Sequence, residues 1–210
     1  MWALVEDNAI TKIINNPKGM VIGDTRYSKN IFSFRWTNEE REAIGIYEVE
    51  FDNSNKKDEQ WYINTNQSFA FAGGKITASY GSATAKAHAD TTWTQEDSDD
   101  GLMPSDKSVG DLKDRGLKYN LIQDIKKQAA QELQNTDWYV VRKADAGTAV
   151  PSAITTHRAA VRTKADEMET AITNAADTPA LETLYTYINT GTEENPVIER
   201  PLGQLPILDS

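Results

Sequence analysis

The hydrophobic residues of this chain change their spacing between its N-terminal and C-terminal parts. Residues 46–51 come close to alternating apolar and charged side chains, which is the pattern of a half-buried strand. Residues 154–172 place apolar side chains three and four positions apart, with only Arg158 polar in the series, as on one face of a helix. Since one type of secondary structure cannot satisfy both periods, the sequence predicts an α+β fold.

Turn, cap and linker signals divide the chain into four predicted segments. The first contains hairpins at 1–16 and 69–80 and one short helix, which begins at the capping box of Thr37 and Glu40 and stops at Gly45. An acidic stretch with Pro and Gly separates these strands from the helical patterns. The predicted segments are a β-rich module at 1–93, a linker at 94–112, a helical hairpin or small bundle at 113–190 and an extended tail at 191–210.

The helical segment carries three narrow apolar stripes. The first covers about 113–135, the second begins at Pro151 or Ser152, and the third runs from Thr178 to Gly191. Helices with so few apolar residues bury little as a lone unit, so we expect a homo-oligomer. The tail ends in apolar residues with little of their own to pack against, and we expect it to dock on another subunit or back onto the module. The residues concerned are Pro196, Val197, Ile198, Leu205, Ile207 and Leu208.

Charge and hydropathy disfavour nucleic-acid and membrane partners. The 210 residues carry a net charge of -10, with 22 basic residues against 32 acidic ones. No basic run exceeds two residues, whereas nucleic-acid binding needs clustered Lys and Arg. No stretch approaches the roughly 20 apolar residues of a membrane-spanning helix, and the N-terminus turns acidic before a signal-peptide core could form.

The residues that usually carry catalysis are sparse, and we expect a non-enzymatic protein without a cofactor. The chain has no Cys, no Gly-x-Ser-x-Gly elbow and no phosphate-binding glycine motif. His88 and His157 are isolated from one another, which disfavours a zinc site. The acidic run from Asp97 to Asp100 fails the EF-hand spacing, because Gly101 stands at the fifth position. A solvated linker is the favoured interpretation of this run, and a loose calcium site is the alternative.

Two parts of the sequence resemble proteins of tailed bacteriophages. Residues 131–141, the Val-Pro pair at 150–151 and residues 157–162 together resemble a motif of tail-fibre and tail-fibre-assembly proteins, with His157 in place of the usual Tyr and Val161 in place of Leu. The N-terminal part is similar to uncharacterised tail-associated proteins of marine phages. The segments that carry this second similarity are 2–6, 14–18, 43–48 and 62–67.

The resemblance implies a structural component of the virion, made in the host cytoplasm and located in the tail. As a tail, baseplate or fibre-attachment protein, it would contact other tail or fibre proteins. Two alternatives stay open. A tail-fibre assembly chaperone would help fibres to trimerise, and a receptor-binding module at a fibre tip would bind glycans through exposed aromatic residues.

The resembling motif also has a physical interpretation. Thr136 or Asp137 can end the first helix, and Trp138 can fold into the groove between two helices. Arg158 and Arg162, one turn apart, can reach carboxylates or the carbonyl groups that end the first helix. If Trp138 is buried in this way, Trp138→Ala should cost about 3 kcal/mol of unfolding free energy and lower the melting temperature.

Overall fold

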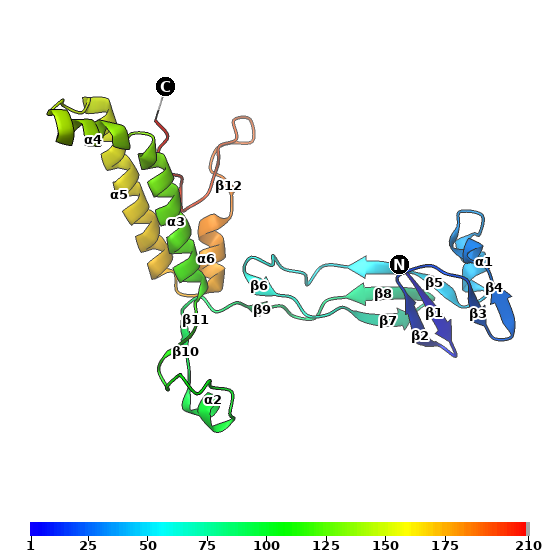
Figure 1. Cartoon of the computed structure of the whole chain (residues 1–210). Helices are drawn as coiled ribbons and strands as arrows, with labels where there is room; N and C mark the ends of the chain where they lie inside the picture. Colours follow the sequence, from blue (N-terminus) through cyan, green and yellow to red (C-terminus); the bar gives the residue numbers. More distant parts are fainter. Residues whose placement is uncertain (209–210) are drawn as a thin grey trace. The chain divides into compact units, whose positions relative to one another are not determined.

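Strands occupy the first part of the chain and helices most of the second, which confirms the predicted α+β class (Figure 1). The computed structural model describes residues 1–208. It divides the chain into two units, Met1–Thr84 and Ala85–Ser210. The division therefore falls before position 93, where the sequence pattern places the end of the β-rich module. Residues 85–93 belong instead with the helices, because they contact the segment before the first long helix.

A five-stranded sheet forms the centre of the first unit. Its order is β2-β1-β5-β8-β7, and every neighbouring pair is antiparallel except the parallel pair of β5 and β8. The strands are β1 (Trp2–Glu6), β2 (Ala9–Ile14), β5 (Ile46–Asp52), β7 (Ser68–Ala72) and β8 (Lys75–Ser79).

Both predicted hairpins are confirmed, and both turns require positive φ. Asp7 and Asn8 lie between β1 and β2 with φ of 50° and 61°. Gly73 and Gly74 lie between β7 and β8 with φ of 58° and 76°. Two consecutive residues with positive φ match the right-handed twist of the flanking strands, so each turn sets the register of its hairpin.

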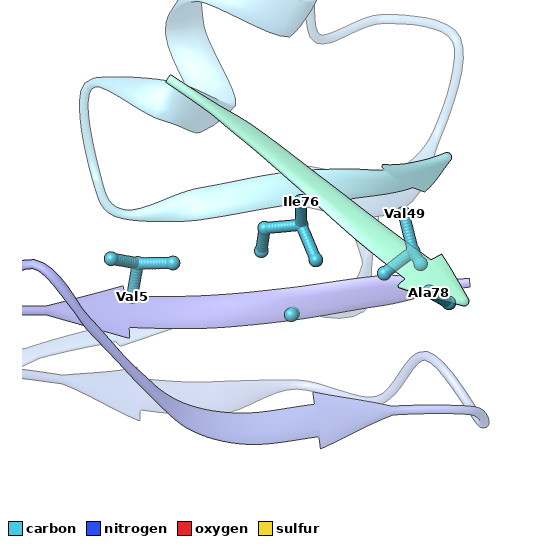
Figure 2. Close-up of a cluster of buried hydrophobic side chains, with 5 residues drawn as sticks. Val5, Val49, Ile76 and Ala78 are labelled. Atoms are coloured by element: carbon cyan, nitrogen blue, oxygen red, sulfur yellow. The ribbon is translucent and has the colours of Figure 1, made fainter. Parts of the chain in front are cut away.

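Apolar side chains cover both faces of the sheet. Successive residues of a strand point to opposite faces, and β1 therefore sends Val5 into one cluster and Leu4 into another. The first cluster joins Val5 to Val49, Ile76 and Ala78, as Figure 2 shows. The second contains Leu4, Ile14, Ile31 and Ile46.

Short elements complete the first unit. The helix α1 (Asn38–Glu42) begins at the predicted capping box, in which Glu40 N donates to Thr37 Oγ1 at 3.2 Å and Thr37 N donates to Glu40 Oε2 at 2.8 Å. Its Arg41 is buried and donates from Nε to the Ile31 carbonyl at 2.8 Å. The remaining elements are β3 (Met20–Ile22), β4 (Thr25–Tyr27), the 3-10 helix η1 (Lys29–Phe32) and β6 (Tyr62–Ile63), with β9 (Thr84–Ala85) at the unit boundary.

Two long helices lie side by side in the second unit (Figure 1). They are α3 (Leu117–Gln134) and α5 (Ser152–Asn174), and the shorter α6 (Thr178–Tyr185) follows α5. The buried residues of α3 are Leu121, Ile125 and Ala129, so that Leu121 replaces the predicted Ile122 in the stripe. The third helix ends at Tyr185, well before Gly191, because Thr186 leaves the helical conformation with ψ of 125°.

The predicted linker at 94–112 has structure of its own. It contains the helix α2 (Gln95–Asp99), and strands β10 (Thr91–Thr92) and β11 (Leu112–Asp114) pair on either side of it. Thr94 and Asp97 form a capping box, in which the shorter Asp replaces the usual Glu at the third helical position. In the predicted tail, β13 (Ile198–Glu199) pairs with β12 (Ile188–Asn189), which precedes it, as a small hairpin.

Gly45 offers a direct test of this packing in the first unit. Its φ is +81°, and a Cβ added there would lie 2.5 Å from the Val5 carbonyl oxygen. We expect Gly45→Ala to lower the unfolding free energy by at least about 2 kcal/mol, measured by urea denaturation. Gly73→Ala is the matched control, because its φ is +58° but nothing lies within 4 Å of the added Cβ. Equal losses in both variants would contradict the close approach at Gly45.

Candidate protein-contact site

The break between α3 and α4 (Asp137–Ala146) is held by the buried guanidinium of Arg158. From α5, Arg158 Nη1 donates to the Leu133 carbonyl at 2.9 Å and to Thr136 Oγ1 at 2.6 Å. The same nitrogen lies 2.8 Å from Asp137 Oδ1. Carbonyl groups at the end of a helix lack partners within that helix, so this cation satisfies a group that the break exposes.

The sequence-predicted residues meet only in part at this break. Thr136 is 1% exposed and its Oγ1 also donates to the Leu133 carbonyl at 2.8 Å. Arg158 reaches both kinds of acceptor that the sequence suggests, a carboxylate and a carbonyl at the end of the helix. Arg162 does not join it, since its Nη1 reaches only the Arg158 carbonyl on the same helix, at 3.4 Å.

Trp138 is not buried between the helices, and this prediction is wrong. Its side chain is 51% exposed, because Asp137 begins a separate helix that takes the indole away from the groove. The buried hydroxyl of Thr136 and the guanidinium of Arg158 occupy the junction instead. The sequence analysis expects no helix between about 135 and Pro151, and the left-handed Gly147 that ends α4 is the signal it missed.

The outer side of α4 presents aromatic and aliphatic groups. The rings of Trp138 and Tyr139 stack with centroids 3.9 Å apart, and the Arg142 guanidinium lies 4.6 Å and 5.4 Å from their centroids. Val140 and Val141 are 44% and 64% exposed. None of the residues of α4 is buried. A ten-residue helix is marginal in water without tertiary packing, so α4 is a candidate surface for a protein contact.

The predicted contact residues of the tail lie in a segment that we call the C-terminal arm, residues 186–208. Pro196, Val197 and Ile198 are exposed in or beside its hairpin. Leu205 is half-buried, whereas Ile207 and Leu208 are exposed. All residues from 186 to 199 are exposed, so the hairpin itself rests on little.

Two residues that the sequence pattern missed attach the arm to the helices. Leu202 is 2% exposed, and its N–H donates to the Leu184 carbonyl of α6 at 3.0 Å. The Arg200 guanidinium lies 5.2 Å from the ring centroid of Tyr185. Burial raises the pKa of Tyr185 to about 12, in spite of this nearby cation. A lone Leu between Pro201 and Gly203 was the only sequence signal for this anchor.

The acidic run takes part in local contacts. Asp97 accepts from Lys113 Nζ at 2.6 Å and caps α2 through Thr94. The Lys113 ammonium, followed by the N–H and hydroxyl of Thr94, lowers the pKa of Asp97 to about 2. Within residues 1–208, no three His, Asp or Glu side chains converge where they would hold one metal ion. The calcium interpretation of Asp97 to Asp100 therefore gains no support from the geometry.

The two histidines lie in different surroundings. His157 is 8% exposed on α5, and its Nε2 is buried without a hydrogen-bond partner among the described residues. His88 instead provides its backbone carbonyl to the N–H of Lys118 at 3.0 Å. In the same described part of the chain, no helix combines the length and apolar character needed to cross a bilayer.

Comparisons of the chain with protein-family models, curated proteins and solved structures find no match. A function for the chain is therefore inferred from the geometry of α4 and the C-terminal arm, together with the motif resemblance of residues 131–162.

Arg158 should be the most sensitive position of the helical unit. Arg158→Met keeps much of the apolar stem but leaves the Leu133 carbonyl and Thr136 hydroxyl with one partner fewer. We expect a loss of about 2 kcal/mol in unfolding free energy, measured by urea denaturation. Arg162→Met and the exposed Trp138→Ala are controls that should each change it by less than about 1 kcal/mol. A larger loss of unfolding free energy for Trp138→Ala would indicate that Trp138 is buried between the helices, as the sequence pattern suggested.

Asp97 should make the 91–114 segment sensitive to acid. A pKa lowered to about 2 in the folded state means that the ionised carboxylate contributes stability above its unfolded pKa. This contribution is lost as the pH falls from about 4 through about 2. Carboxyl NMR titration should give a midpoint for Asp97 well below that of an ordinary Asp. Lys113→Met should raise this midpoint, and an unchanged midpoint would exclude the Lys113 contact as its main cause.

Proposed function

We propose that this chain is a non-enzymatic structural component of a tailed-phage virion, located in the tail and acting through contacts with tail or fibre proteins and with further copies of itself. The observation that carries the proposal is a set of exposed large apolar side chains on two elements that contain no buried residue. These elements are the α4 helix and the hairpin of the C-terminal arm.

The total surface of the chain supports a role in assembly. The chain exposes 14016 Å². Two separate globular domains with the sizes of its two units would together expose about 11,700 Å². The surplus of about 2,300 Å² is comparable with what one subunit contributes to a large obligate interface, about 1,000–2,500 Å². A protein that assembles with neighbours would cover part of such a surface.

The kinds of side chain on these elements support protein contacts. Interfaces are enriched in aromatic residues, and a half-exposed Trp beside a Tyr is typical of an anchor that a partner covers. Trp138 and Tyr139 provide this pair on α4, and Ile198 adds a side chain that is 60% exposed on the arm. Residues 131–162, which resemble tail-fibre and fibre-assembly proteins, include the end of α3, all of α4 and the first half of α5.

Counting copies in purified particles tests this proposal. Quantitative mass spectrometry of gradient-purified phage should find the chain at a fixed ratio to the major capsid protein, in multiples of three or six. Such a ratio is expected because closed tail rings and fibres repeat by symmetry. Presence in the infected-cell lysate with absence from particles would overturn the proposal in favour of the assembly chaperone.

A pair of variants links that count to α4. Val141→Asp places a charge on the exposed apolar side of the helix and should lower the copy number in particles, because burying an unpaired charge is costly. Lys143→Asp introduces the same residue on the same helix at an exposed position that is already charged. It should leave the copy number unchanged, and equal losses in both variants would argue against α4 as the contact.

A further inference from the structure

The C-terminal arm is attached to its own helical unit by a small set of contacts near one end. Leu202 is its only buried side chain among the described residues, and Arg200 lies over Tyr185 beside it. Gly203 adds a close approach to α5, since a Cβ there would lie 2.9 Å from Lys164 Cε. The fourteen positions before Arg200, from 186 to 199, are all exposed. The arm is thus anchored at Leu202 and connected to α6 by a segment in which no residue is buried.

Beyond its anchor the arm lies beside α3 without being buried there. Leu205 and Ile207 of the arm line an open pocket of about 250 Å³ together with Gln128 and Gln131 of α3. Ile207 remains 77% exposed at this pocket, so the end of the arm is not packed as a core element.

We propose that the arm is exchanged between copies, so that Leu202 of one chain occupies the Leu202 site of a second chain. This proposal deepens the self-association that forms part of the proposed function. The group that would occupy the Leu202 site of the second chain is another Leu202, because an arm of the same sequence already fits that site. An exchanged arm makes the same contacts with α3, α5 and α6 of its new neighbour, which is why such exchange is a low-cost route to oligomers.

The exposed segment and the surplus surface both favour exchange over a purely internal arm. A connection without buried residues can change direction without losing packing. The surplus of about 2,300 Å² per chain is enough for an interface of this kind, because stable pairs bury about 800 Å² per partner.

The absence of Cys from the sequence allows a clean crosslinking test. Gln131→Cys on α3 and Ile207→Cys on the arm place single thiols at the same open pocket. The two single variants are co-expressed with different affinity tags, purified through both tags, and treated with a short bis-maleimide. Exchange predicts a covalent species of twice the chain mass that carries both tags. Mass spectrometry of its peptides should show residue 131 joined to residue 207.

Two further substitutions show whether the anchor directs this product. Leu202→Asp in the chain that carries Ile207→Cys should lower the yield of the crosslinked pair roughly tenfold, because a charge cannot occupy the apolar site. Thr192→Asp is the matched control at an exposed polar position of the same arm, and it should leave the yield within about twofold. Circular dichroism of both variants verifies that the helices are intact.

The double variant Gln131→Cys/Ile207→Cys completes the design. If it crosslinks within one chain while the co-expressed single variants give no joint product, the arm stays on its own chain and exchange is overturned. If neither sample crosslinks, the arm does not lie against α3 in either form, which also overturns it. The outcome is separate from the particle count: a fixed copy number in virions without crosslinking removes the exchange alone, and crosslinking in a protein absent from particles removes the tail location alone.

Discussion

The helical unit depends on one buried cation. Arg158 lies near the start of the buried stripe of α5, and its guanidinium contacts the Leu133 carbonyl of α3, the hydroxyl of Thr136 and the carboxylate of Asp137. Without this cation, the Leu133 carbonyl would keep only the bonds from the N–H and hydroxyl of Thr136, and the buried Thr136 oxygen would lose its charged donor. The contact therefore lets α3 end, lets α4 leave in a new direction and keeps α5 packed along α3. The break between α3 and α4 therefore requires a polar residue, Arg158, in the buried stripe of α5.

Both units bury their apolar residues in narrow cores. Some of their other elements contain no buried residue. In the first unit, the sheet shares its apolar side chains between two faces, with Leu4 and Val5 in different clusters. In the second, α3 and α5 bury one stripe each, whereas no residue of α4 or of the arm hairpin is buried. The chain consequently has more surface than two separate globular domains of its size, and the exposed residues of α4 and the arm include several large apolar ones. This distribution is the physical link between the fold and the proposed role in protein contacts.

The candidate site could be predicted where a sequence motif relates its residues. The pattern of Thr136, Asp137 and Arg158 was recognisable because residues 131–162 resemble a motif in which a polar helix end precedes a helix that carries arginine. The position of Trp138 was not, since half a turn of helix after the break decides whether an indole faces in or out. Leu202 was missed for a related reason: its burial depends on Leu184 and α6, which are close in space but leave no periodic pattern around a single Leu.

Local chemistry determined much of the secondary structure from the sequence by itself. The capping box at Thr37, the turns at Asp7–Asn8 and Gly73–Gly74, and the long helices each depend on residues within one or two turns of one another. Only the tertiary structure decided the strand order, the unit boundary at Thr84, the separate helix α4 and the anchoring of the arm. These features depend on contacts between residues far apart in the chain. The free energy of such contacts comes from which surfaces are buried together, and the order of residues along one segment does not specify that.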